Sequence, residues 1–372
     1  MDALEAAIAA DPDAREGYLV LGDWLQERGD PRGELIAIGA ELAKSPFDAA
    51  MQRNHAAHLA AHPELLGPLQ GCLDVVTELD WYCGFIRGCR VAYTKDRFNA
   101  PSPARRKPGD LEDVAIADVI GWLLDDPAPG RFLQHLVVGL VRQDANQYDT
   151  ITEVLARRPR PTLRSLTLGD FARDECELNW SDLGDLSRLW AAVPELERLV
   201  LRGGTMGLGG IQLPVLQELT TITGGLDAGS ARAIADAEWP ALTKLSLQYG
   251  PESDAGFDAI APLLAGAHLP RLRHLGITNF GDTDAVCEAL PRAAILPRLA
   301  VLDLSMGTMS EAGLAALLRD AGKLAHLERI ELDDNYLPAT ARARLAAVLP
   351  NVRFGTQREL DDGEQRHASA FE

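Results

Sequence analysis

The stretch LERIELDDNYLPATARARLAAVLP, residues 327–350, decides the fold that this sequence predicts. Leu327, Ile330 and Leu332 are spaced so that alternate side chains of a short strand point inward. Asn335 follows at a turn, where a carboxamide can hydrogen-bond backbone groups. The stretch therefore predicts a short inward-facing strand that ends in a turn stabilised by asparagine.

The same pattern returns along the chain from about residue 131. The copies begin at residues 133, 163, 196, 216, 242, 272, 299 and 327, so most intervals are 26–33 residues and one is 20. Helical segments such as residues 310–318 lie between copies, and each packs an apolar stripe on the strand layer. A period of this length indicates a solenoid, because no single repeat buries its apolar face alone. The predicted fold is an α/β solenoid with a parallel sheet on its concave face and helices on its convex face.

This array resembles the leucine-rich repeats, especially the long, helix-bearing type typified by ribonuclease inhibitor. The copy from Leu327 matches best, with Asn335 at the usual turn position. Asn279 is expected to take this role in its own repeat, whereas other repeats have glycine or aromatic residues there. The irregular turns leave the repeat boundaries open. We expect about eight repeats within residues 131–355.

A small helical domain is predicted for residues 1–70. Tyr18, Leu21 and Leu25 recur at helical spacing. Gly29 suits a left-handed helix end, and Asp30 can cap the next helix with Pro31 at its first position. The residues ERGDPRGE, 27–34, are therefore predicted to join two helices.

Residues 3–42 resemble the bacterial repeat-companion domain, which usually precedes leucine-rich or other repeats. The matching positions are Asp23, Trp24, Leu25, Glu27, Arg28, Gly29, Asp30, Pro31, Arg32, Gly33 and Glu34. Gly22 stands where the family more often has alanine, and it predicts a close contact between helices. The resemblance implies an accompanying module without established activity. We expect the module to cover the first strands of the array, with Trp24 in its core.

The remaining segments connect or extend the array. Residues 71–130 are expected to hold a strand, a basic, proline-rich loop that includes Arg105–Lys107, and a helix. The strand is indicated by Phe85, Ile86, Val91 and Tyr93. Residues 356–372 contain few core-forming residues and are expected to form a flexible tail.

Charge and composition limit the classes of partner. The formal charge of −19 repels phosphate, so nucleic acid is not expected as a partner. No apolar run approaches the ~20 residues of a membrane-spanning helix, and the acidic N-terminal stretch lacks the basic region of a secretory signal. The chain is therefore expected in the cytoplasm. Its five cysteines match no zinc pattern and are expected to be reduced, although a Cys83–Cys89 disulfide stays open.

The sequence holds no recognisable catalytic motif. Phosphate-binding, zinc-protease and serine-hydrolase motifs are missing. The glycine-rich residues 203–210 lack lysine and are interpreted as a shortened, helix-poor repeat rather than a phosphate loop. His55, His58 and His62 share a helical face, which fits either a weak metal site or an ordinary amphipathic helix. We expect no catalytic residue, no cofactor and no metal site.

The concave sheet is the candidate binding surface, since a rigid parallel sheet with varied side chains suits extended contact with a protein. The predicted partner-binding residues are Arg198, Arg202, Lys244, Gln248, Tyr249, His274, Asn279, Asp303, Arg329, Glu331 and Asp333. The expected function is a non-catalytic scaffold for a protein partner. Two alternatives stay open. One is the substrate-recognition part of an enzyme or ubiquitin-ligase-like effector, and the other is an immunity-type inhibitor of a basic toxin.

Overall fold

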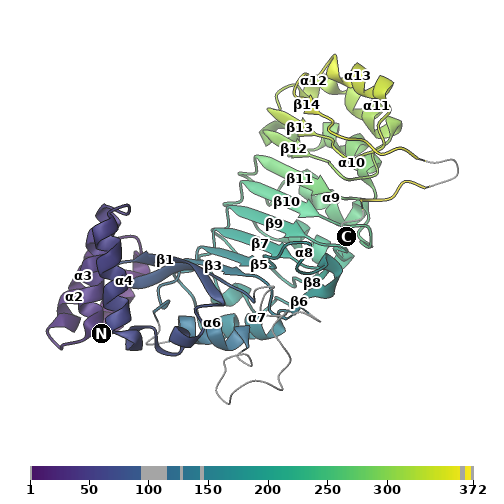
Figure 1. The fold of residues 1–372 in the computed structure, drawn as a ribbon. Coiled ribbons are helices and arrows are strands. Elements are labelled where there is room, and N and C mark those ends of the chain that lie inside the picture. The colour runs from purple at the N-terminus through teal and green to yellow at the C-terminus, as the bar shows by residue number, and fades with distance from the viewer. Residues whose placement is uncertain (1, 94–114, 126–128, 143–145, 361–364, 370–372) are drawn as a thin grey trace, which may run out of the picture. The chain divides into compact units, whose positions relative to one another are not determined.

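A computed structural model describes residues 2–93, 115–125, 129–142, 146–360 and 365–369. The chain forms two compact units (Figure 1). The first contains Met1–Gln143 and Thr150–Phe171, and the second contains Asp144–Asp149 and Ala172–Glu372. The predicted basic run Arg105–Lys107 lies outside the described residues. Within the described part, no helix has the length and apolar character to cross a membrane.

Helices open the first unit. They are α1 (Asp2–Ala10), α2 (Arg15–Gln26), α3 (Pro31–Lys44) and α4 (Ala49–Ala61), followed by the short helices η1 (Pro63–Leu65) and η2 (Gly67–Gly71). The predicted joint is confirmed, because Gly29 has φ +70° and the Asp30 side chain accepts a hydrogen bond from the Arg32 main-chain N–H. A Cβ on Gly22 would lie 3.0 Å from Cγ2 of Ile36, so the predicted close helix contact is present.

The helices of the first unit pack on a β-hairpin. Strand β1 (Val76–Tyr82) runs antiparallel to β2 (Phe85–Val91), and β2 pairs in parallel with β3 (His135–Val138), which pairs with β5 (Ser165–Leu168). Helices α6 (Ile116–Leu124) and α7 (Asp149–Ala156) lie between these strands in the chain. The rings of Tyr18 and Phe132 lie 5.9 and 4.9 Å from that of Phe85, and Trp24 packs half-buried against the same core. The N-terminal helices therefore cover the hairpin.

Parallel strands form the sheet of the second unit. In spatial order they are β7 (Arg198–Arg202), β9 (Glu218–Ile222), β10 (Lys244–Gln248), β11 (His274–Thr278), β12 (Val301–Asp303), β13 (Arg329–Glu331) and β14 (Val352–Arg353). The central leucines and isoleucines of β7 and β9–β13 are buried. Strands β3, β5, β7 and β9–β13 all lie where the repeated pattern predicts them.

Helices cover one side of this sheet (Figure 1). They are α8 (Ala228–Asp236), α9 (Phe257–Ala265), α10 (Thr283–Ala289), α11 (Glu311–Arg319), α12 (Ala321–Leu324) and α13 (Ala339–Ala346). Short helices η7 (Leu290–Arg292) and η8 (Leu296–Arg298) follow α10. Parallel strands with helices on one side agree with a solenoid of leucine-rich-repeat character.

The repeats at the start of the second unit depart from this plan. Between β7 and β9 the chain forms β8 (Thr205–Gly207), which joins β4 (Asn146–Gln147) and β6 (Ser181–Asp185) in a small parallel sheet. The short helices η5 (Leu178–Trp180) and η6 (Trp190–Ala192) flank β6. The glycine-rich residues 203–210 are thus part of a shortened, helix-poor repeat, as predicted.

The predicted role of Asn279 is wrong. Its side chain is fully buried, yet neither Nδ2 nor Oδ1 has a hydrogen-bond partner among the described residues. Counted from the strand, Phe280 occupies the position that Asn335 holds in its own repeat. Asn279 instead shares a positive φ with Met306 and Asp334, at +53°, +62° and +51°. Its residue type therefore suits a left-handed backbone position.

The described residues of the C-terminal segment make polar contacts with the repeats. Arg366 Nη1 lies 3.0 Å from Asp284 Oδ2, and the Tyr336 hydroxyl donates to the His367 carbonyl at 3.1 Å. The Ser369 main-chain N–H donates to the Met306 carbonyl at 3.1 Å. These polar contacts join residues 366–369 to the repeats, and the flexibility of residues 356–372 stays a prediction.

Candidate binding face of the second unit

The side of the sheet opposite the helices, from β7 to β13, is called the open face here. Its side chains form rows because parallel strands pair in register. The first row is Arg198, Glu218, Lys244, His274, Val301 and Arg329. The second row is Val200, Thr220, Ser246, Gly276, Asp303 and Glu331. A third set at the strand ends comprises Arg202, Ile222, Gln248, Thr278, Ser305 and Asp333, of which Gln248, Thr278 and Ser305 are buried.

Most charges at the two ends of the open face are paired. Arg198 Nη2 lies 3.1 Å from Glu218 Oε1. Arg329 Nε lies 2.8 Å from Glu331 Oε1, which Arg353 also approaches at 3.6 Å. Lys244 differs, since no carboxylate of the described residues lies within 4.0 Å of its ammonium group. It is therefore a cation that an incoming partner can neutralise.

His274 lies beside Lys244 in the first row. Partial burial lowers the pKa of its imidazole, and the positive charge of Lys244 lowers it further. The carboxylates of Asp303 and Glu218 act in the opposite direction on this pKa. Because the net pKa shift is downward, His274 is neutral at pH 7 and offers a hydrogen-bond donor and acceptor rather than a charge.

The carboxylates of Asp303, Glu331 and Asp333 lie towards the β13 end of the open face. Asp303 Oδ1 accepts the Ser305 main-chain N–H at 3.0 Å, and Asp333 Oδ1 accepts that of Asp334 at 3.0 Å. Each carboxylate is thereby held by its own turn. At the centre of the second row, a Cβ on Gly276 would lie 3.2 Å from Ser246 Oγ. The open face thus combines a central cation, small central side chains and an acidic end.

Three predicted partner-binding residues are not available on this surface. Tyr249 and Asn279 are fully buried, and Gln248 is 7% exposed. Tyr249 follows the last residue of β10, so strand alternation turns its ring inward, 4.6 Å from that of Phe280. Asn279 follows β11 and also lies inward. The other eight predicted residues lie on the open face and keep exposed area: Arg198, Arg202, Lys244, His274, Asp303, Arg329, Glu331 and Asp333.

The sequence reasoning missed Glu218, Thr220 and Arg353. Glu218 and Thr220 belong to the irregular copy at Leu216, Leu219 and Ile222. The pattern of this copy predicted a strand, but its surface-facing residues were not named. Their alternation with Leu219 would have placed them on the surface. Arg353 lies on β14 and reaches Glu331 only because β13 and β14 pair.

The cysteines and histidines considered for catalysis or metal binding are buried or hydrogen-bonded within the chain. All five cysteines are buried, and none of them forms a disulfide. Burial raises the pKa of Cys83 to about 11 and that of Cys89 to about 12, so both thiols are protonated at neutral pH. His58 Nε2 lies 2.9 Å from the Pro31 carbonyl, and His62 Nδ1 lies 2.9 Å from Glu64 Oε1. Among the described residues, no group of three or more histidine, cysteine or carboxylate side chains is placed to hold a metal ion.

The repeats and the open face define a protein of leucine-rich-repeat character. The chain is 33% identical to the ribonuclease inhibitor of Sus scrofa over 118 residues, which span 31% of this chain and 25% of that protein. The match therefore covers about a quarter of the relative's length. The crystal structure of a Bacteroides fragilis protein has the same fold, with a TM-score of 0.63, 23% identity and 84% coverage of each chain. No family model matches the chain, so the repeat-companion resemblance of residues 3–42 stays a prediction.

Proposed function

We propose that this protein is a non-catalytic scaffold that binds a protein partner on the open face of its second unit. The observation that carries the proposal is the central Lys244, which has no carboxylate within 4.0 Å in the described part of the chain. It lies beside the neutral His274, with carboxylates of Asp303 and Asp333 towards one end. The relative is named as an inhibitor of a ribonuclease, and this supports a protein as the partner. A rigid sheet also limits the entropy lost on binding.

The charges indicate what the partner presents. A carboxylate opposite Lys244 would neutralise the central cation, and a basic side chain opposite Asp303 or Asp333 would pair with the acidic end. A specific interface typically buries ~1,600 Å² in total. Six adjacent strands with surface-facing side chains, β7 and β9–β13, offer a surface suited to contact on that scale.

The two narrower alternatives differ in what supports them. A thiol-dependent enzyme needs an accessible thiolate, whereas the five cysteines are buried and the pKa of Cys83 and Cys89 is raised. An inhibitor of a basic toxin is a special case of the proposed scaffold. The acidic end of the open face and the net charge of −19 favour it. Identification of the bound partner would distinguish a toxin inhibitor from other protein-binding scaffolds.

The test compares charge reversals on the two sides of the sheet. The full chain is immobilised as wild type, Lys244→Glu, Asp303→Lys and, as a control on α8, Arg232→Glu. Proteins retained from an extract of the source cells are quantified by mass spectrometry. We expect a partner that the wild type and Arg232→Glu retain and that the face variants lose by about tenfold, because a reversed charge repels its counterpart.

The same experiment can contradict the proposal. Equal retention of every protein by wild type and the face variants, with circular dichroism showing folded variants, would exclude the open face as the binding surface. Both substituted side chains lie on the surface, so reversal of either charge is expected to leave the fold intact.

A further inference from the structure

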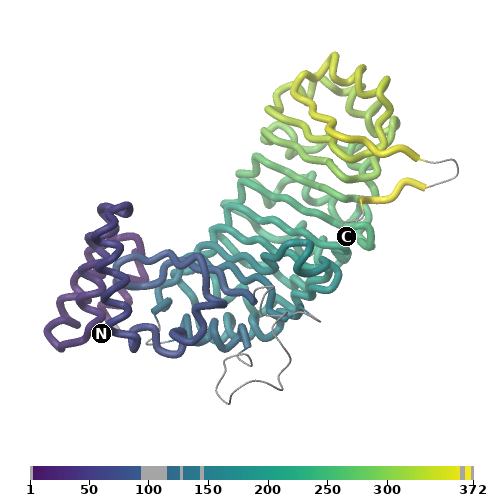
Figure 2. Tube along the Cα trace, in the orientation of Figure 1, coloured from purple at the N-terminus to yellow at the C-terminus, as the bar shows by residue number. Residues whose placement is uncertain are grey.

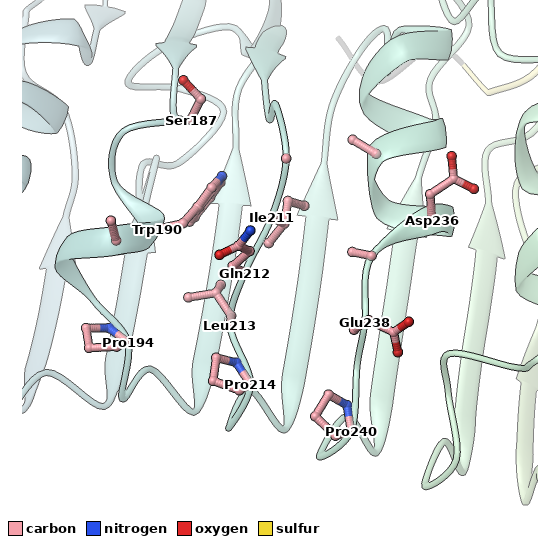
Figure 3. Close-up of a pocket in the computed structure, with 14 residues that line it drawn as sticks. Ser187, Trp190, Pro194, Ile211, Gln212, Leu213, Pro214, Asp236, Glu238 and Pro240 are labelled. Carbon is pink, nitrogen blue, oxygen red and sulfur yellow. The ribbon is translucent and has the colours of Figure 1, made fainter.

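A groove of about 960 Å³ lies on the helix side of the second unit (Figure 3). Its walls are η6, which carries Trp190, and the end of α8 with Ala233 and Asp236. Figure 3 shows the segment from Ile211 to Pro214 running between these walls as the floor, and Gly210 also lines the groove. All of these residues belong to the second unit.

The groove exists because one repeat lacks its helix. Leu196 and Leu216 begin successive copies only 20 residues apart, and the chain between β7 and β9 forms β8 instead of a helix. The following repeats carry α8, α9 and α10, of 9, 9 and 7 residues. The groove is therefore the place where a regular array would seat its next helix.

Hydrogen bonds fix both walls to β8 and the residue that follows it. Trp190 Nε1 donates to the Leu208 carbonyl at 2.7 Å, which ties η6 to the segment after β8. On the other side, Ser230 Oγ of α8 donates to the Met206 carbonyl at 3.0 Å. Buried polar groups satisfied in this way hold the groove open as a defined shape.

The volume fits one short helix. A helix of nine residues is about 13.5 Å long and about 10 Å across, which corresponds to a cylinder of roughly 1,100 Å³. The groove has about 960 Å³. A single helix of the length found in α8 or α9 therefore matches the available space.

The exposed lining is apolar along one end and acidic on one wall. Pro194, Pro214 and Pro240 supply the exposed apolar part and lie along one end in Figure 3, whereas Ile211 and Leu213 are buried beneath the floor, with 7% and 1% exposure. Asp236 and Glu238 carry carboxylates on the α8 side, and both residues are exposed. Asp236 has no cation within 4.0 Å among the described residues, while Glu238 Oε1 contacts His268 Nδ1 at 2.7 Å.

We propose that this groove docks an amphipathic helix of about nine residues from a partner protein. Its apolar side would lie against Pro194, Pro214 and Pro240, and lysine or arginine residues on its flank would face Asp236 and Glu238. Amphipathic helices commonly bind apolar grooves in this way. The groove lies on the side of the sheet opposite the open face, so this inference stands independently of the proposed function.

The test uses a labelled 18-residue helical peptide with a leucine stripe flanked by lysines, and a matched peptide with glutamate in place of lysine. Fluorescence anisotropy follows the binding of each peptide to the full chain. The basic peptide should bind at least about tenfold more tightly than the acidic one, a difference of about 1.4 kcal/mol. Asp236→Lys combined with Glu238→Lys should reverse this preference.

Gly210→Trp blocks the groove without strain. A Cβ at Gly210 meets no atom within 4 Å, so the new ring extends into open space on the floor. We expect Gly210→Trp to weaken the binding of the basic peptide by at least about tenfold. Gly322→Trp on α12 is the matched control, because a Cβ there also meets no atom within 4 Å and the position does not line the groove.

Four outcomes would overturn the inference. The first is equal binding of the two peptides. The second is unchanged binding by Gly210→Trp. The third is sedimentation of the wild type as a dimer that Gly210→Trp alone converts to a monomer, which would assign the groove to a second copy of this chain. Loss of binding by both Gly210→Trp and Gly322→Trp would place the peptide elsewhere and would also contradict it.

Discussion

The Asn335 carboxamide donates a hydrogen bond from Nδ2 to the Leu304 carbonyl, 2.9 Å away in the preceding repeat. The same nitrogen lies 3.1 Å from the Asp333 carbonyl, and Oδ1 accepts the Met309 main-chain N–H at 3.0 Å. The side chain is fully buried. One amide therefore links the turns of two successive repeats.

Asn335→Ala should lower the free energy of unfolding by about 2–4 kcal/mol, because several buried backbone groups lose their partner and each costs about 1–3 kcal/mol. Urea titration followed by circular dichroism measures the change. Asn279→Gly provides the contrast. Glycine tolerates the φ of +53° there, and the Asn279 amide has no partner among the described residues. Loss of the Asn279 side chain should therefore change the free energy of unfolding by about 1 kcal/mol or less. Equal losses for the two variants would refute the assigned role of Asn335.

Arg32→Leu should destabilise the first unit by about 3 kcal/mol, since charged hydrogen bonds contribute about 1.5–3 kcal/mol each. Arg32 is 7% exposed and donates to the Leu65 carbonyl at 2.6 Å and the Gly84 carbonyl at 3.3 Å. Arg28→Leu is the matched control. Arg28 is exposed, and its guanidinium stacks 3.8 Å from the centre of the Trp24 ring, so about 0.5–1 kcal/mol is expected. Thermal denaturation of both variants measures the difference. A similar melting temperature for the two would contradict the prediction.

His55 should make the first unit less stable in mild acid. Burial, and then the neighbouring His58, lowers its pKa below the ordinary 6.5, so the unfolded chain binds the proton more tightly. The free energy of unfolding should fall as the pH drops below about 6.5. His55→Phe keeps an aromatic ring near Trp81, whose ring lies 5.1 Å away, and removes the titration. Urea midpoints at pH 7.5 and 5.5 should therefore differ less in His55→Phe than in wild type. His62→Phe, at the exposed end of α4, should not reproduce this effect.

Local sequence patterns predicted the elements that depend on local forces. Leucine spacing placed the strands, because an inward position every second residue is a property of the strand itself. Gly29 and Asp30 marked a helix joint, since the backbone geometry of caps is set by the residues that form them. The irregular copy at Leu216 was also recognised, although its facing residues Glu218 and Thr220 were overlooked.

The ends of strands and the C-terminal segment could not be predicted in this way. The inward turn of Tyr249 depends on where β10 stops and on Phe280 of the next repeat. Residues 365–369 are held by partners such as Asp284 and Tyr336, which lie far away in the sequence. No local pattern encodes such contacts.

The sequence by itself determined the repeating strands, their parallel stacking and the alternation that turns side chains of both signs outward. Only the tertiary structure decided that Arg198 and Arg329 are neutralised, whereas Lys244 has no ion-pair partner among the residues that the structure describes. It also decided that a missing helix leaves a groove between η6 and α8. The physical reason is the distance along the chain over which each kind of interaction acts. Backbone geometry and apolar periodicity act over a few residues, whereas charge pairing and the filling of space depend on neighbours that only stacking of the repeats brings together.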